Sequence, residues 1–587
     1  MLEHHLPKLV ACVRIRFDVS DAFRLAGVIA ILFLLGGHAV ATEPKALRAY
    51  DGMPDGAQDY AAFVKLWDDF LHWRDPKSAL KERSLVDVAG LETDVYPDYS
   101  AEAVAARLRE LREIQGELDD FAVADWPLRQ QVEFLAVRAK MDEEEFTLRV
   151  SKPWSRDPGF YADRMLRLTF TELPVAGDVL AEFVRQLDAI PGLAMQGKSN
   201  LIDVAADYAD LAIFNLSNSD GVGHGFPDRA EPPAGVLGWY DDLLGRAQSQ
   251  QPDLVERIET ARAAVESFRD WLIANRPEMT ANAGVGKETF DWYLKHVKLM
   301  PYTSDDIVTL GQRELDRLWA LYALERHRNR ELPEIEMSGS ATEYQSRIDE
   351  TDLAIRRFLV EEAIITIPDY IDELSTNVPW IVRDGGPNFW EQIQYRNPTP
   401  DHLHAVIPGH RFDAVLERNN PHPVRGRLTD DARVEGWAVY LEEAIMNAGL
   451  LDDKPRVREL IYLFGIFRAA RMPADVWLQL NVMTAEQVAD YWIERVPYLD
   501  RDVARVDAEI YLRRPPGYGL GYTTGMLQMQ TLLAERKRQL GEGFRLKDFH
   551  DELMAAGRLP LSLIRWEMTG NDAGIAALWS REPLPVN

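Results

Sequence analysis

Apolar residues recur at helical spacing along nearly all of the chain after residue 41, and this pattern limits the fold more than any other feature. It is clear in 60–73, where Phe63, Leu66, Trp67 and Phe70 share one stripe, and in 101–150. No alternation of strands with helices occurs. Proline and glycine interrupt the pattern over 217–233 and 375–401, and the only strands we expect lie at 380–383 and 389–395. The sequence therefore predicts a mainly α fold, a large multi-helix body with few short strands, arranged as one body or as two lobes around a central cleft.

Length and composition set the broad class. The chain has 587 residues, 46% of them hydrophobic, and carries a formal net charge of −29. A chain this long can bury a large core. An acidic surface repels nucleic acid and anionic lipid, so we expect neither as a partner. No linker or internal repeat divides the body, and we predict a single helical domain over 42–587, with the half around 375–587 carrying the functional motif.

Residues 1–41 have the order of an export signal. A basic lead with Lys8 and Arg24 precedes the uncharged run 25–37, and Ala39-Val40-Ala41 is a small-x-small cleavage pattern. The run is shorter than the roughly 20 residues that span a bilayer. We predict a cleaved signal and a periplasmic or secreted protein without stable membrane insertion, with an uncleaved anchor as the alternative.

Cysteine is confined to the predicted signal. Cys12 is the only one in the chain and lies far from the cleavage pattern, so lipid attachment is not indicated. The mature chain would then have no disulfide, no thiolate metal ligand and no cysteine nucleophile.

The stretch from His404 to Glu443 carries the clearest chemical motif. It reads H-A-V-I-P-G-H and, after a polar interval, E-G-W-A-V-Y-L-E-E. Two imidazoles and one carboxylate, His404, His410 and Glu435, are the ligand set of a catalytic zinc site with an open fourth position. The usual zinc-hydrolase motif has a glutamate directly after its first histidine, and here that position is Ala405.

Spacing alone does not decide whether His404 and His410 can bind one metal ion. Six residues in an unbroken helix place His404 and His410 about 240° apart around the axis. A break at Pro408-Gly409 would be needed to turn both rings inward. Purely structural histidines are the alternative. His402 is a further candidate ligand beside His404, whereas His422 lies in a proline-flanked loop and is expected to be exposed.

The glutamates that follow need partners. Glu435 and Glu442 are seven residues apart on nearly one helical face, which Trp437 also occupies, and a buried carboxylate is costly without a cation or donor. A metal is one partner, and Arg468 or Arg471 is the alternative. Glu443 is expected to point toward solvent or a neighbour.

Further segments match a known family. The two motifs resemble H-E-x-x-P-G-H and E-G-W-A-x-Y-x-E, and similar segments lie at 292–303, at 515–525 and from Phe549 to Leu561. On these residues the chain resembles the bacterial family catalogued as domain of unknown function 885. The resemblance covers nearly all of the predicted mature chain.

The resemblance implies a mainly helical, zincin-like protein and a zinc-dependent peptidase. It assigns His404, His410 and Glu435 as zinc ligands. Tyr522 matches a tyrosine that could donate a hydrogen bond to an oxyanion. Asp475 matches the aspartate of a D-x-x-x-H pattern, in which the histidine is replaced here by Gln479.

The sequence favours two functions over the others. The first is a zinc-dependent hydrolase of peptides or small amides with altered machinery, in which Glu442 or Glu443 replaces the missing base at Ala405. The second is a degenerate peptidase that binds its ligand without cleaving it. A non-hydrolytic reaction at the metal is a third possibility without a motif of its own, and the absence of a G-x-S-x-G elbow disfavours a serine hydrolase.

Overall fold

The described part of the protein is built from helices. The computed structural model describes residues 58–75, 98–219, 232–371, 374, 378–383 and 385–585. Within these ranges no β-strand occurs, and the only β-type pairing is two isolated bridges, Ala205 with Ala281 and Thr429 with Arg558. The prediction of a mainly α fold is confirmed. The two-lobe arrangement stays a prediction.

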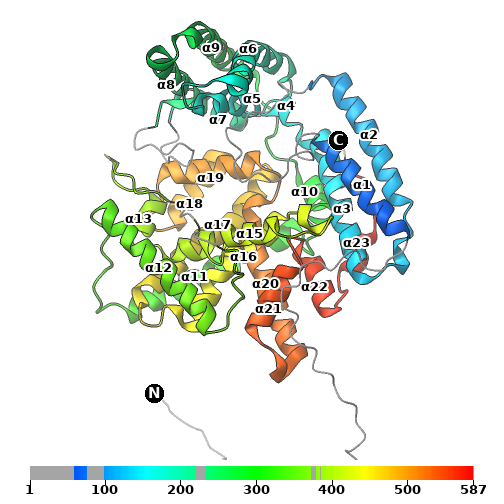
Figure 1. Ribbon diagram of the computed structural model, residues 1–587, viewed down its shortest axis with the longest axis vertical. Coiled ribbons are helices and arrows are strands. Elements are labelled where there is room, and N and C mark those ends of the chain that lie inside the picture. Colours follow the sequence, from blue (N-terminus) through cyan, green and yellow to red (C-terminus); the bar gives the residue numbers. More distant parts are fainter. Residues whose placement is uncertain are drawn as a thin grey trace, which may run out of the picture. The chain divides into compact units, whose positions relative to one another are not determined.

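The helices follow one another along the chain (Figure 1). The first part of the chain forms α1 (Gln58–Arg74), α2 (Ala101–Asp119), α3 (Leu128–Phe146), α4 (Pro153–Arg156), α5 (Gly159–Arg167), α6 (Gly177–Asn200), α7 (Ala206–Ser217), α8 (Gly235–Gln250) and α9 (Val255–Asn275). The middle forms α10 (Lys287–His296), α11 (Ser304–Arg328), α12 (Ala341–Glu361), α13 (Phe389–Arg396), α14 (Thr399–Asp401), α15 (His410–Arg418) and α16 (Asp431–Ile445). The last part forms α17 (Pro455–Gln479), α18 (Ala485–Arg495), α19 (Arg501–Arg513), α20 (Tyr518–Leu540), α21 (Leu546–Ala555), α22 (Leu561–Thr569) and α23 (Ile575–Trp579).

Short 3-10 and π-helical turns complete the secondary structure. The 3-10 turns are η1 (Val123–Asp125), η3 (Leu168–Phe170), η4 (Pro252–Leu254), η5 (Arg276–Glu278), η7 (Arg425–Arg427) and η9 (Gly541–Gly543). The π-helical turns are η2 (Thr147–Ser151), η6 (His402–Val406) and η8 (Met446–Leu450).

The expectation of strands at 380–383 and 389–395 is wrong. The second segment is α13, and the first has no regular structure. The reason for α13 is local: Asn388 accepts from the backbone N–H of Glu391, and the Glu391 side chain accepts from the N–H of Asn388. This reciprocal capping box satisfies two donors of the first turn and starts a helix despite the aromatic composition.

The predicted signal, with Cys12 and the boundary at residue 41, lies outside the described residues. No described helix is long and apolar enough to cross a membrane. Leu47–Asn587 forms one compact unit.

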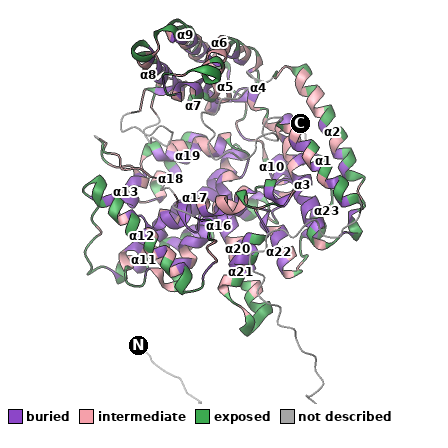
Figure 2. Ribbon diagram, viewed as in Figure 1, coloured by how far each residue is buried: buried purple, intermediate pink, exposed green. Residues whose placement is uncertain are grey.

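The centre of the fold is made by α16, α17 and α20. Figure 2 shows α16 and α17 buried along most of their length, whereas α2 presents a largely exposed face. Helix α17 contacts both α11 and α20, and α20 also packs on α16. Buried helices must satisfy their polar side chains internally, and the candidates Glu435, Glu442, Asp475 and Tyr522 lie on these three helices.

Helices α16 and α20 meet backbone to backbone. A Cβ atom at Gly525 would collide with the carbonyl oxygen of Ala432, and one at Gly436 would collide with the backbone of Gly525. Only glycine permits such an approach at these two positions. Glu435, next to Gly436, is thereby placed close to the first turns of α20.

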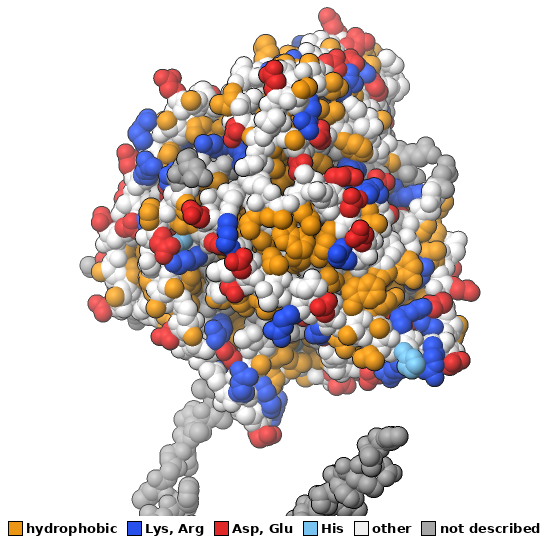
Figure 3. Space-filling model, turned by 180° about the vertical axis from the view of Figure 1, so that it is seen from behind, with side chains coloured by type: hydrophobic (Ala, Val, Ile, Leu, Met, Phe, Trp, Pro, Cys, Tyr) orange, Lys and Arg blue, Asp and Glu red, His pale blue; other side chains and the backbone are white. Residues whose placement is uncertain are grey.

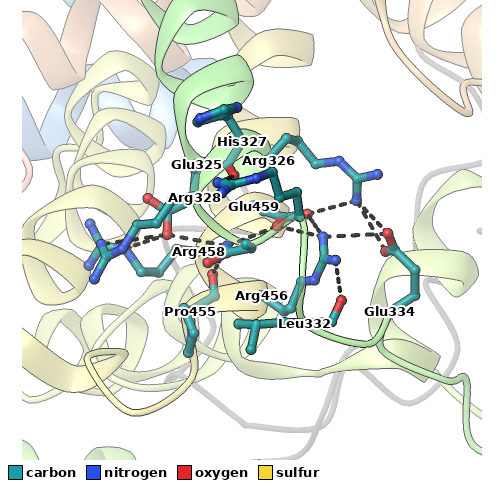
Figure 4. A network of polar contacts seen from close by, with 12 residues as sticks. Glu325, Arg326, His327, Arg328, Leu332, Glu334, Pro455, Arg456, Arg458 and Glu459 are labelled. Atoms are coloured by element: carbon teal, nitrogen blue, oxygen red, sulfur yellow. Dashed lines mark hydrogen bonds and ion pairs between the residues drawn. The ribbon is translucent and has the colours of Figure 1, made fainter.

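An ion network joins the end of α11 to the start of α17 (Figure 4). Arg326 of α11 and Arg456 of α17 both contact Glu459, which is almost fully buried. Asn329 donates to Glu459 and to the backbone carbonyl of Pro455. Because the shared carboxylate is satisfied from two helices, α11 and α17 are fixed to one another at this end.

The surface seen in Figure 3 mixes charges of both signs. Acidic and basic side chains alternate around its edge, and hydrophobic side chains gather near its middle. The acidic excess of the sequence is therefore not collected into one block on this face.

Candidate metal centre

The two predicted histidines lie on two short elements that are separated by an irregular stretch of backbone. His404 lies in the π-helical turn η6, and His410 is the first residue of α15. Between them Ile407 is extended and the Ile407–Pro408 peptide is cis. A Cβ atom at Gly409 would collide with the backbone carbonyl of His404, so this position needs glycine. The helix is broken where the sequence predicted it.

The break brings three ligand-type atoms together. His404 Nε2 lies 3.1 Å from His410 Nε2 and 3.7 Å from Glu435 Oε2, and His410 Nε2 lies 3.1 Å from Glu435 Oε2. The donor atoms of His404, His410 and Glu435 form a group capable of holding a metal ion. His404 and Glu435 are buried, whereas the His410 side chain retains 27% of its accessible surface.

The spacing of these atoms fits zinc. Zn–N and Zn–O bonds of about 2.0–2.1 Å in a tetrahedral site place neighbouring donors about 3.3 Å apart. The three separations given above bracket that value. Glu435 Oε2 is buried and faces both ring nitrogens, His404 Nε2 and His410 Nε2. Three acceptor-type atoms converge here, and either a proton on one of the ring nitrogens or a cation would relieve their repulsion.

Behind His404 stands a buried acid–base pair. The second ring nitrogen, His404 Nδ1, lies 2.8 Å from Glu442 Oε1, and the other oxygen of Glu442 pairs with Arg468. Arg468 Nη2 is 3.2 Å from the same ring nitrogen. The ring is thus held at Nδ1 by both Glu442 and Arg468, and Nε2 faces Glu435 Oε2. A carboxylate behind a ligating histidine is a common way to fix the tautomer and orientation of the ring.

Burial and neighbouring charges shift the pKa values of the residues in and behind the cluster. Burial lowers the pKa of His404 well below its ordinary value, and Arg468 lowers it further, so the imidazole is neutral. Burial raises the pKa of Glu435, but the hydrogen bond and charge of His410 outweigh it, and the net pKa is lowered. Burial raises the pKa of Glu442 to about 8 against the opposing effect of Arg468.

Two tyrosines of α20 line the cluster. Tyr518 donates a hydrogen bond to Glu435 Oε1 at 2.9 Å, and its hydroxyl lies 3.2 Å from that of Tyr522. The Tyr522 ring is parallel to the His404 ring, with centroids 6.3 Å apart. The Arg471 guanidinium lies 4.9 Å from the Tyr522 ring centroid. Burial raises the pKa of both tyrosines, so both hydroxyls keep their protons.

The sequence singled out Tyr522 but missed Tyr518. The missed signal is the spacing, because residues four apart on a helix share a face and α20 begins at Tyr518.

Asp475 lies at the start of α20 rather than among the ligand atoms. Its carboxylate Oδ2 accepts the backbone N–H of Leu520 at 2.9 Å, and the residue is fully buried on α17. A carboxylate at a helix N-terminus pairs with unsatisfied N–H groups and with the positive end of the helix dipole. The contact fixes the first turn of α20, which carries Tyr518 and Tyr522.

The remaining candidates are engaged elsewhere. Glu443 makes two hydrogen bonds with Arg317 of α11, at 2.9 and 2.7 Å. Gln479 donates to the backbone carbonyl of Tyr511. Ala405 is fully buried in η6.

His402 and His422, the other two histidines considered in the sequence, do not join the cluster. His402 Nε2 lies 2.9 Å from Asp352 of α12. His422 is buried rather than exposed as the sequence suggested, because it contacts Glu133 and accepts backbone N–H groups through its Nδ1.

Comparisons with known proteins define the family. The family described as "Bacterial protein of unknown function (DUF885)" matches residues 86–377 and 401–568, which is most of the chain. The protein therefore belongs to the DUF885 family. No curated protein matches it significantly.

Two solved structures have a similar fold. One is a candidate lipoprotein of unknown function from Shewanella oneidensis, with 18% identity, a TM-score of 0.65, and coverage of 87% of this chain and 100% of that chain. The other is a candidate lipoprotein from Colwellia psychrerythraea, with 18% identity, a TM-score of 0.62, and coverage of 86% and 97%. At this identity the likeness shows the fold alone.

The Asp475→Asn variant tests whether burial raises the pKa of this carboxyl group. The measured quantity is the free energy of unfolding as a function of pH. Burial raises the pKa of Asp475 to about 7, against the opposing effect of backbone N–H groups at the start of α20. An unfolded aspartate titrates near about 3.9, so between these values the folded protein holds a proton that the unfolded chain has released. This group's contribution to the free energy of unfolding therefore falls with rising pH, by up to about 1.4 kcal/mol per pH unit.

Asparagine has no proton to lose, so the stability of the parent relative to the variant should decline steadily from about pH 4.5 to about pH 7. Urea unfolding of both proteins across that range measures the difference. A constant difference, or one that grows with pH in favour of the parent, would contradict the raised pKa.

Proposed function

We propose that this protein is an exported zinc-dependent hydrolase that acts on peptides or related small amides. The observation that carries the proposal is the convergence of His404 Nε2, His410 Nε2 and Glu435 Oε2 at separations that suit tetrahedral zinc. Three protein ligands leave a fourth position for water or substrate, which is typical of catalytic rather than structural zinc. The partial exposure of His410 supports access from solvent.

The residues around the cluster suit amide hydrolysis. Zinc held by His404, His410 and Glu435 would supply Lewis acidity, which polarises a carbonyl group and acidifies water. The protonated hydroxyl of Tyr522 is a donor for the negative charge that develops on a carbonyl oxygen, whereas Tyr518 donates its hydrogen bond to Glu435 Oε1. Glu442 and Arg468 hold the His404 ring in its orientation.

A carboxylate base is the missing part. The two acids that the sequence offered as replacements for the base are both paired with arginines, Glu442 with Arg468 and Glu443 with Arg317. A general base typically contributes about 10²–10⁴-fold to the rate. We therefore expect slow turnover, and we place Glu442 among the groups that orient His404.

Export is proposed from the N-terminal sequence. Residues 1–41 carry a basic lead, an apolar run and a cleavage pattern. Two proteins of similar fold are named as candidate lipoproteins, which would also be exported. The only cysteine here is Cys12, ahead of the apolar run, so we propose a periplasmic or secreted protein without a lipid anchor.

Zinc content is the direct test. The purified mature chain should bind about one equivalent of zinc, and a chelator should remove both the metal and slow hydrolysis of a peptide and ester panel. His410→Gln should abolish binding, because one of three ligands is lost. The matched control is His402→Gln, which alters a neighbouring histidine paired with Asp352. Metal analysis showing no zinc in the parent, or equal loss in both variants, would refute the site.

A second experiment separates orientation from base catalysis at Glu442. Glu442→Gln should weaken zinc binding about tenfold, because the carboxyl group that holds His404 from behind is replaced by an amide. Glu443→Gln alters the adjacent glutamate, which pairs with Arg317 and not with a histidine, and should leave zinc affinity within about twofold. Chelator competition measures both. Unchanged affinity in Glu442→Gln with a large loss of turnover would instead make Glu442 the base.

A degenerate peptidase that only binds peptides is the second candidate, favoured by Ala405 and Gln479. Ala405→Glu restores the carboxylate of the family motif, and Ala405→Gln is the matched control of equal size. Under the hydrolase proposal the parent turns over slowly, and Ala405→Glu raises the rate by up to about 100-fold while Ala405→Gln does not. A zinc-loaded parent with no turnover, made active by Ala405→Glu, would establish the degenerate form instead.

A further inference from the structure

A second cavity lies apart from the metal-binding cluster. It has a volume of about 650 Å³ and is bounded by α10, the turn 299–303, α20, α22, α23 and the segment 582–585. None of its lining residues belongs to the cluster of His404, His410 and Glu435. The volume is in the range of sites that hold small molecules.

The interior of the cavity is mainly apolar. Leu299, Met300, Leu561 and Ile575 line it and are buried, and the half-buried ring of Tyr302 adds an aromatic surface. Such a lining favours the apolar body of a ligand, because displacing water from it is the main source of affinity.

The C-terminal segment forms one wall and is tied in place. Trp292 Nε1 donates to the backbone carbonyl of Glu582 at 3.0 Å, and Leu584 is buried in a cluster with Phe146, Trp292 and Tyr293. These contacts hold the wall from both sides of residue 583. The cavity is therefore largely preformed.

Among the described residues, the positive charges at the rim of the cavity are paired, but not all of the negative charges are. Lys295 pairs with Glu582, and Arg565 makes two hydrogen bonds with Glu535 at 2.7 and 2.6 Å, so both cations are matched. Glu288, by contrast, is exposed, lines the cavity, and makes no ion pair with any described residue.

A second acid adds to the excess. Asp291 shares its cation, Lys287, with Asp305. The uncompensated charge at the rim is negative, which favours a ligand with a positive end.

We propose that this cavity binds a small organic amine, with its apolar body against Tyr302 and Ile575 and its ammonium group near Glu288 and Asp291. The site is independent of zinc and of hydrolysis at the cluster. A ligand there would bridge α10, α20 and α23, which come from distant parts of the chain.

A charge series tests the ligand class on the purified full mature chain. The probes are phenethylamine, 2-phenylethanol and phenylacetate, which share a ring and a two-carbon chain and differ in charge. Calorimetric titration should show the amine binding about two- to fivefold tighter than the alcohol, and the acid weakest. Equal binding of amine and alcohol, or no binding of either, would overturn the proposal.

Variants place the binding in this cavity. Glu288→Gln should bring the amine down to the affinity of the alcohol. Its matched control is Glu256→Gln, because Glu256 is likewise the second residue of its helix, exposed, and without an ion pair among the described residues. A loss of amine binding in the control equal to that in Glu288→Gln would overturn the assignment.

Thr531→Trp should fill the cavity and abolish binding of every probe. The substitution should leave the fold intact, because the Thr531 hydroxyl donates to the Leu527 carbonyl within α20 and the described residues show no bond from it to another helix. Ala573→Trp adds a large side chain at another residue that lines the same cavity. Circular dichroism melting and zinc content of both variants should match the parent. Undiminished binding in either folded variant would place the amine elsewhere.

Discussion

The site depends on a contact between two backbones. Gly436 of α16 and Gly525 of α20 have no side chains to hold the helices apart, and each position would clash if it carried one. This approach places Glu435 beside Tyr518 and Tyr522, which come from a segment more than 80 residues later in the chain. Gly409 has the corresponding role between η6 and α15, where it lets His410 fold back toward His404. Glycine at these points is therefore part of the site, although it offers no functional group.

Arginine–carboxylate pairs form the layer behind the cluster. Arg468 holds Glu442, Arg471 holds Asp507, and Arg317 holds Glu443, so each pair joins residues from different helices or from distant positions. A buried charge pair costs desolvation free energy and adds little net stability. Its value here is positional, because the orientation of His404 follows from the position of Glu442. The same pairing explains why the acids near Ala405 are poorly placed to act as bases.

The sequence was enough to predict the class of fold and the backbone break within the cluster, but not every helix. Helical spacing in segments such as 60–73 was enough for a mainly α body, because periodicity reports which face of a helix is buried. The break at Pro408-Gly409 was also predictable from residue type. The prediction of a strand in place of helix α13 is wrong. The aromatic residues of Phe389–Arg396 favour a strand, but the capping pair Asn388 and Glu391 starts a helix. Local side-chain capping decided that segment.

Other features had no local signal. The pairing of Glu442 with Arg468 joins two helices, and sequence reasoning offered metal and arginine as alternatives for both glutamates. The structure divides them: Glu435 faces the histidine nitrogens, and Glu442 takes the arginine while also contacting His404. The burial of His422 depends on Glu133, almost 300 residues earlier. Contacts of this range are set by the packing of whole helices, which the residue pattern of one segment does not contain.

The close crossing of α16 and α20 also bears on how the cluster can open. Two helices whose main chains touch cannot slide past each other without a clash, so Glu435 and the two tyrosines form a stationary wall. The side chain of His410 is the most exposed of the three, so a molecule that reaches the cluster passes this residue. The fixed side of the cluster is thus set by α16 and α20, and the approach to it by the start of α15.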